Sequence, residues 1–79
     1  MDRVQAFGLA VRKARQRAGF SQEALAEKAG LHRNWISLVE RGLHPAALDS
    51  VFAMADALGL SAASLVEEAE RTSQDGPRR

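Results

Sequence analysis

The sequence is 79 residues long and 46% hydrophobic but only 5% aromatic, so it holds one small domain with a largely aliphatic core. It contains no cysteine, which excludes disulfide bonds, thiolate metal sites and a thiol nucleophile. Eleven basic and ten acidic residues give a formal net charge of +1, a sum that by itself indicates no class of partner.

Two helices are expected in the first part of the chain, from the spacing of apolar residues and the position of helix-ending glycines. The first is predicted over 2–18 and ends at Gly19. Ser21 is a good N-cap for a second helix over 22–29, which Gly30 ends.

Three further helices are expected after Gly30, and no segment has the alternation of a strand. The third is predicted over about 33–41 and is followed by Gly42 and a turn containing Pro45. The fourth is predicted over 48–58 and the fifth, capped by Ser61, over about 62–71.

The predicted fold class is therefore all-α, a compact bundle of five short helices. We expect the domain to span residues 1–72 and residues 73–79 to form a flexible C-terminal tail. The expected core side chains come from every helix: Val4, Phe7, Leu9, Val11, Ala14, Leu25, Ala26, Ala29, Leu31, Ile36, Val39, Leu43, Val51, Phe52, Ala55, Leu58, Leu65, Val66 and Ala69.

Charge is distributed unevenly along the chain. Residues 3–17 hold five basic side chains and no acidic one, whereas residues 49–70 hold five acidic side chains and no basic one. This asymmetry favours a protein that presents one basic face to a polyanion. Ordinary solvated helix faces would account for it equally well.

The third predicted helix has a narrow apolar side and a broad polar one. Ile36 and Val39 point to the core side, Asn34 and Arg41 lie opposite, and Trp35 falls on a flank. Arginine can donate two hydrogen bonds to the acceptors of guanine, asparagine can form a pair of hydrogen bonds with adenine, and small or apolar groups can contact the thymine methyl. The polar side therefore suits the reading of base edges, although a plain amphipathic helix with a solvated face fits this segment too.

Two short helices that meet at a tight turn form a helix-turn-helix, whose second helix enters the DNA major groove. Residues 21–42, SQEALAEKAGLHRNWISLVERG, resemble the helix-turn-helix of the phage-repressor/Cro-like family, often called XRE. LDSVFAMADALGLSAASLV resembles the family's fourth and fifth helices and VRKARQRAGFSQ its first, so the resemblance spans about residues 7–66. LHRNWIS and the short chain look most like the controller proteins of restriction–modification systems. The resemblance implies a lambda-repressor-like domain that binds an operator in double-stranded DNA as a homodimer.

The resemblance also implies roles for individual residues. Gln22 matches a phosphate-binding glutamine, and a helix N-terminus attracts phosphate in any case. Trp35 matches a position beside the sugar–phosphate backbone, with packing against the second helix as the alternative. Arg15 and Glu40 match a structural ion pair. The base-edge positions are Arg33, Asn34, Ser37 and Leu38, and Arg41 matches a backbone contact.

Three departures from the family pattern change what is expected. The turn after Gly42 reads LHPAA where many members carry basic residues, so His44 is the only candidate contact there. His32 stands where a serine, threonine or aspartate usually caps the third helix; it is a weaker cap and a candidate phosphate contact. Leu38 occupies a position that is often polar in the family, which favours either apolar contact with a thymine methyl or no base contact at all.

The functional alternatives are both binding proteins. The sequence shows no Ser/His/Asp set and no glycine-rich phosphate loop, and its histidines have no cysteine partner for a metal site. We therefore expect neither an enzyme nor a metal or other cofactor. One reading is a dimeric transcriptional regulator of its own or a neighbouring promoter, and the other is an antitoxin whose main partner is a toxin. The apolar residues Leu60, Leu65 and Val66 are the expected dimer interface. With no apolar run of about 20 residues and no signal peptide, the expected location is the cytoplasm, on the nucleoid.

Overall fold

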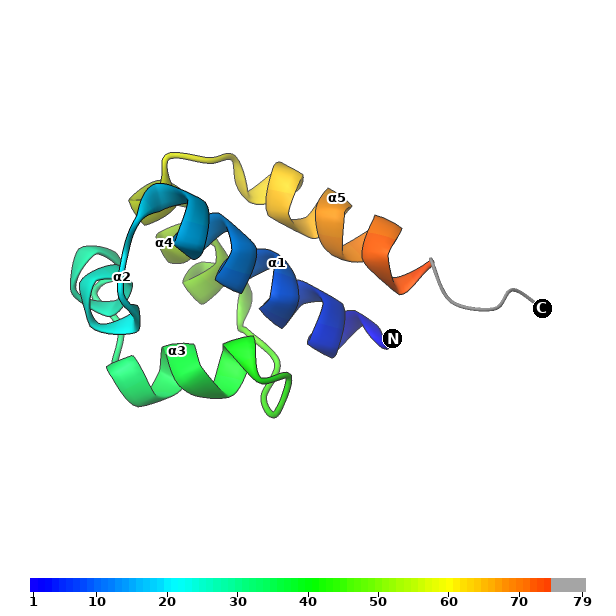
Figure 1. The fold of residues 1–79 in the computed structure, drawn as a ribbon, viewed down its shortest axis with the longest axis horizontal. Helices are drawn as coiled ribbons and strands as arrows, with labels where there is room; N and C mark the ends of the chain where they lie inside the picture. Colours follow the sequence, from blue (N-terminus) through cyan, green and yellow to red (C-terminus); the bar gives the residue numbers. More distant parts are fainter. Residues whose placement is uncertain (75–79) are drawn as a thin grey trace.

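The computed structural model describes residues 1–74, which form five α-helices (Figure 1). The predicted all-α class is confirmed. The helix ends differ from those expected by two residues at most, and the last helix includes Ser73, which was assigned to the tail. Gln74, also in the expected tail, is the C-cap of this helix, and the part of the tail from residue 75 on lies outside the described residues. The helices are α1 (Arg3–Ala18), α2 (Gln22–Ala29), α3 (Arg33–Glu40), α4 (Leu48–Leu58) and α5 (Ala62–Ser73).

Short polar side chains fix where three of these helices begin. The side chains of Asp2, Ser21 and Ser61 each accept a hydrogen bond from the backbone N–H three residues later. Such caps satisfy donors that the first helical turn leaves without an intrahelical partner. In the described part of the chain, His32 and Ala47 make no such bond to α3 and α4. Helices α1, α2 and α5 therefore begin with a side-chain cap that α3 and α4 lack.

The described residues bury two adjoining apolar clusters. The larger one contains Leu25, Ile36 and Met54 and joins α1, α2, α3 and α4. The smaller one joins α1, α4 and α5 through Ala10, Ala14, Ala55 and Leu65. Helix α3 contributes only to the larger cluster, so its side facing away from that cluster is left at the surface.

Three of the expected core residues are wrong. Phe52 is 52%, Leu43 60% and Val66 44% exposed, whereas Met54, which is not among the expected core residues, is fully buried. On α4, Val51 and Met54 are three residues apart and share the buried face, while Phe52 is rotated about 100° from Val51. Leu43 follows the end of α3 and lies in the loop to α4.

Helices α1 and α3 approach each other closely through two glycines. A Cβ atom placed on Gly8 would lie 2.1 Å from the carbonyl oxygen of Val39, so only hydrogen fits there. At the end of α3, Gly42 adopts a positive φ of 71°, and a Cβ there would lie 2.8 Å from Cγ of Gln5. A left-handed backbone is a conformation that glycine adopts at little cost. The two contacts hold α3 against α1 along its C-terminal half.

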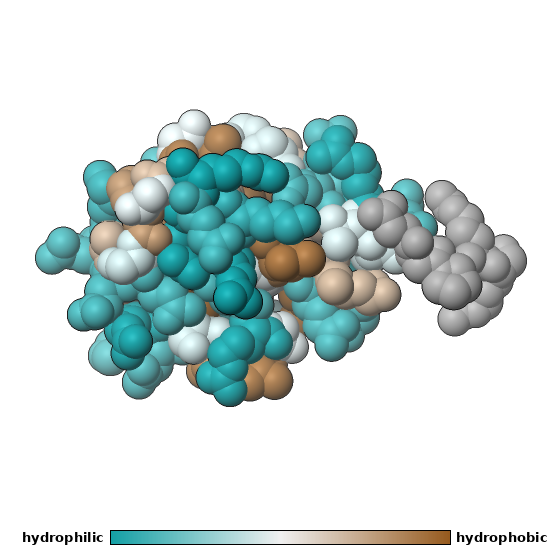
Figure 2. Space-filling model, in the orientation of Figure 1, coloured by the Kyte–Doolittle hydropathy of each residue, from teal (hydrophilic) through white to brown (hydrophobic). Residues whose placement is uncertain are grey.

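The surface of the molecule is mostly polar on the face that Figure 2 shows, with hydrophobic side chains in separate small clusters. Within residues 1–74, no single helix is long and apolar enough to cross a membrane. Helices α4 and α5 reach that length and hydropathy only when counted together, and the chain bends by 106° between them.

Candidate nucleic-acid interface

Helix α3 lies along one outer edge of the molecule, with α5 at the opposite edge and α1 between them (Figure 1). It packs against α1 and α2 and buries Ile36, Val39 and Glu40. Arg33 and Asn34 are exposed on its first turn. The helix thus presents most of its length, including its N-terminal turn, to the outside of the molecule.

The side chains expected to contact DNA are all reachable from that outside. Ser37 and Leu38 are half-buried on α3, and Arg41 is exposed just after its end. These side chains lie in the segment that follows Gly30, whose left-handed backbone makes the tight turn between α2 and α3, whereas Gln22 lies at the start of α2 and His44 in the loop after α3. The expected contact residues that are exposed are His32, Arg33, Asn34, Arg41 and His44.

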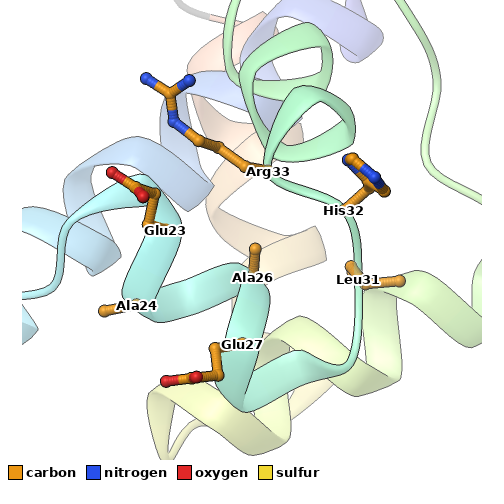
Figure 3. A pocket seen from close by; sticks show the side chains of 7 residues that line it. All are labelled: Glu23, Ala24, Ala26, Glu27, Leu31, His32 and Arg33. Carbon is orange, nitrogen blue, oxygen red and sulfur yellow. The ribbon is translucent and has the colours of Figure 1, made fainter.

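A hollow of about 510 Å³ separates the outer face of α2 from the first turn of α3 (Figure 3). Glu23 and Glu27 line its α2 side, and His32 and Arg33 line its α3 side. The charge therefore changes sign across the hollow. Glu23 lies on the first turn of α2, so the carboxylates reach the start of that helix, whereas Arg33 places a guanidinium at the start of α3. A polyanion is repelled by the carboxylates and attracted by the guanidinium.

His32 precedes α3 without capping it through its side chain, as the sequence led us to expect. Its carbonyl oxygen accepts the first helical hydrogen bonds, from the backbone N–H groups of Trp35 and Ile36 at 3.0 and 3.2 Å. The imidazole itself is exposed at the surface. It is thus positioned for contact with a ligand that lies against the first turn of α3.

Trp35 packs into the protein, which is one of the two roles that the sequence left open; a place beside the sugar–phosphate backbone stays a prediction. Its side chain is half-buried and packs against the larger core cluster. His44, from the loop after α3, meets the indole edge-on, with the ring centroids 4.6 Å apart. The indole N–H is buried and has no hydrogen-bond partner among residues 1–74. Trp35 therefore packs for stability and also anchors the loop that carries His44.

A network of hydrogen bonds joins the ends of α1, α2 and α3. The guanidinium of Arg15 donates to both carboxylate oxygens of Glu40, from Nε at 2.6 Å and from Nη2 at 2.9 Å. It also donates from Nη1 to the carbonyl oxygen of Phe20 at 2.9 Å. The expected Arg15–Glu40 pair is thus bidentate, and the Glu40 side chain is only 2% exposed.

The same carboxylate binds Gln22. Nε2 of Gln22 donates to Oε1 of Glu40 at 3.2 Å, so the expected phosphate-binding glutamine is tied to α3.

Hydrogen bonding to Glu40 raises the pKa of Arg15, against a smaller opposing effect of burial. Because this pKa rises on folding, the stabilisation is complete below the ordinary arginine pKa and falls only at higher pH. Arg15 is consequently charged at every working pH.

The expected basic face on the first helix is wrong in part. Arg15 is taken up by Glu40 inside the molecule, and Arg17 reaches toward α5, where its Nη1 lies 3.9 Å from Oε1 of Glu68. Two of the basic side chains of α1 therefore face acidic partners rather than a single outer surface. The basic groups that accompany α3 are its own Arg33 and the following Arg41.

The three residues expected at a dimer interface do not share a surface. Leu65 is only 2% exposed because it belongs to the smaller core cluster, so its assignment to the interface is corrected. Leu60 lines a hollow with Ala14 and Leu58. Val66, 44% exposed, lines a different hollow of about 190 Å³, whose other lining residues are Arg3, Val4, Phe7, Pro45, Ala46 and Val51.

Comparison with known proteins agrees with this geometry. A family described as a helix-turn-helix domain matches residues 6–69. The control protein C.BamHI of Bacillus amyloliquefaciens is 39% identical over 62 residues, which cover 77% of this chain and 76% of that protein.

Solved structures show the same fold. The restriction–modification controller protein C.AhdI from Aeromonas hydrophila has a TM-score of 0.77 and 35% identity, covering 78% of this chain and 94% of that one. The clp gene regulator ClgR from Corynebacterium glutamicum has a TM-score of 0.89 and 27% identity, covering 94% and 79%. The likeness to controller proteins expected from the sequence is confirmed, and the chain belongs to the helix-turn-helix domain family that includes C.BamHI.

Proposed function

We propose that this protein is a sequence-specific transcriptional regulator that binds a palindromic or near-palindromic operator as a homodimer and controls restriction–modification genes, its own among them. The observation that carries the proposal is the exposed outer side of α3, where Arg33 and Asn34 stand on a helix held by α1 and α2. Likeness to C.BamHI and C.AhdI supports the restriction–modification assignment.

The most direct test is selection of bound sequences from random double-stranded DNA. A consensus made of two related half-sites about one helical turn apart supports the proposal, because two-fold symmetric proteins place their recognition helices that far apart. Recovery of no preferred sequence would contradict it. Purification of the protein from its native host in a stoichiometric complex with a small protein would favour the antitoxin alternative instead.

Removing a base contact and removing a phosphate contact are expected to change DNA binding in different ways. Arg33→Ala should cost roughly 1–3 kcal/mol of binding free energy per half-site and relax the base preference at one position, because an arginine guanidinium can donate two hydrogen bonds to guanine. Gln22→Ala should weaken binding to every duplex by a similar factor, because phosphate contacts carry no sequence information. Repeating the selection and measuring affinity for operator and random duplexes distinguishes the two.

The matched variant for Arg33 is Asn34→Ala, the next residue on the same turn. It should relax preference at a different position, expected to be an adenine. If the selected consensus of Arg33→Ala is identical to the parent's while affinity falls on all sequences alike, Arg33 is a backbone contact. Recognition of the base sequence would then depend on Asn34, Ser37 and Leu38.

Dimerisation is proposed to use the apolar surface around Val66, which joins the start of α1, the start of α4 and α5. Leu48 and Phe52 add two exposed apolar side chains on neighbouring α4. A charge in an apolar interface is costly to desolvate, so Val66→Asp should weaken self-association and operator binding together. Sedimentation measures the first and a DNA-binding titration the second.

Leu60→Asp is the control, since Leu60 is similarly exposed but lines a different hollow. It is expected to leave the dimer intact. A parent protein that sediments as a monomer at high concentration both with and without operator would overturn the dimer proposal, whatever the variants do.

A further inference from the structure

We propose that Glu40 positions the side chain of Gln22 to donate a hydrogen bond to a DNA phosphate. The proposal rests on the proposed function, because it requires DNA to lie against the N-terminus of α2. It assigns to Glu40 a part in DNA binding in addition to its ion pair with Arg15, although the carboxylate itself is buried and does not contact DNA.

The geometry begins with the position of Gln22 between the core and the surface. Gln22 is the first residue of α2, and it is half-buried. Its Nε2 donates inward to Oε1 of Glu40 at 3.2 Å. A side-chain amide nitrogen carries two hydrogens in one plane, so the second must point about 120° away from the first. With the first directed at a buried carboxylate, the second is left to point away from that carboxylate.

The negative charge of Glu40 also selects which end of the amide faces inward. If the Gln22 amide were reversed, its carbonyl oxygen would lie against the carboxylate oxygen and the two would repel. A phosphate offers only acceptor oxygens, so a contact with it requires a donor. Glu40 thus favours the one orientation of Gln22 that keeps the amide nitrogen directed and fixed before DNA arrives.

Glu40 is itself held in place. Arg15 donates to both of its oxygens and also to the carbonyl oxygen of Phe20, which lies just before α2. The carboxylate therefore has little freedom to rotate away from Gln22. Preorganisation of this kind lowers the entropy lost when a side chain is immobilised on binding.

The alternative is that the Gln22–Glu40 bond only ties α2 to α3. A double-mutant cycle separates the two, with affinity for a short random-sequence duplex measured at one salt concentration where all variants are folded. Gln22→Ala and Glu40→Gln should each weaken binding about 3- to 10-fold, the range of one hydrogen bond. In the double variant the loss should be no larger than for Gln22→Ala alone. Losses that multiply would overturn the positioning role.

Glu68→Gln is the matched control, because it makes the same carboxylate-to-amide change in the Arg17–Glu68 pair, which does not contact Gln22. It changes the net charge of the protein as Glu40→Gln does, and the affinity for the random duplex should not fall. A loss of affinity as large as that of Glu40→Gln would overturn the positioning role, because it would not depend on Gln22.

The unmodified protein provides a test that needs no variant to fold. In its NMR spectrum, one of the two side-chain amide protons of Gln22 should be shifted downfield and slow to exchange because it is bound to Glu40. Adding the random duplex should leave that proton protected and shift the other. Loss of the protected proton on DNA binding would show that Gln22 leaves Glu40 and would overturn the proposal. Absence of binding to any duplex would overturn the proposed function as well.

Discussion

Gly8→Ala is expected to lower the free energy of unfolding by about 3 kcal/mol, because the added methyl group would meet the backbone of α3. The same exchange in a free-standing helix is stabilising by roughly 0.5–1 kcal/mol, so the sign itself is informative. The new Cβ would lie 2.1 Å from the carbonyl oxygen of Val39 and 3.0 Å from that of Glu40. Backbone atoms in a packed helix cannot move aside as the tip of a side chain can. Denaturant unfolding at matched protein concentration measures the difference.

Gln16→Ala is the control for Gly8→Ala, since it adds helix propensity at an exposed site of the same helix. Its effect should stay within about 0.5 kcal/mol of the parent. Gly8→Ala should also weaken operator binding more than its stability loss explains, because α3 must shift away from α1. If Gly8→Ala is as stable as the parent, α1 and α3 do not approach each other as closely as the structure places them.

The helix ends were predictable from the sequence because they depend on local chemistry. Ser21 and Ser61 cap helices through bonds to residues three positions away, and Gly30 makes its turn with its own backbone. The core was less predictable. Helical spacing alone does not say which of several apolar residues on α4 face inward. The sequence predicted Phe52 in the core, whereas Met54 is the residue that is buried. The hydrophobicity of Phe52 does not indicate whether its side chain faces the core or the solvent.

The candidate nucleic-acid interface likewise has features that the sequence predicts and features that it does not. The exposed residues of α3 followed from the pattern of one helix and from the resemblance to phage-repressor-like proteins. The Gln22–Glu40 bond joins residues 18 positions apart on different helices, and the role of Gly8 depends on how closely α1 packs on α3. Likewise, Leu65 and Val66 are adjacent and similar in character, yet one is core and the other surface. These features arise from tertiary packing, which a single sequence does not specify.

The second large effect is expected for Glu40→Ala, which should cost about 2–4 kcal/mol of stability. The change leaves the Arg15 guanidinium, whose side chain is only 12% exposed, without the carboxylate that binds two of its nitrogens. It also removes the acceptor of the Gln22 amide. A buried charge that loses its partner keeps the cost of desolvation and loses the compensating attraction. Thermal unfolding monitored by circular dichroism is a suitable measurement.

Glu68→Ala is the matched control for Glu40→Ala, because α1 makes an arginine–glutamate pair at each site and the two pairs differ in burial. The Arg17–Glu68 pair is longer, at 3.9 Å, and Arg17 is largely exposed. Exposed pairs contribute from zero to about 1 kcal/mol, so Glu68→Ala should unfold close to the parent. The prediction is therefore a difference between two chemically identical changes. Equal losses would mean that the Arg15–Glu40 pair is as well solvated as the surface pair, and that the ends of α1, α2 and α3 are held together by apolar packing alone.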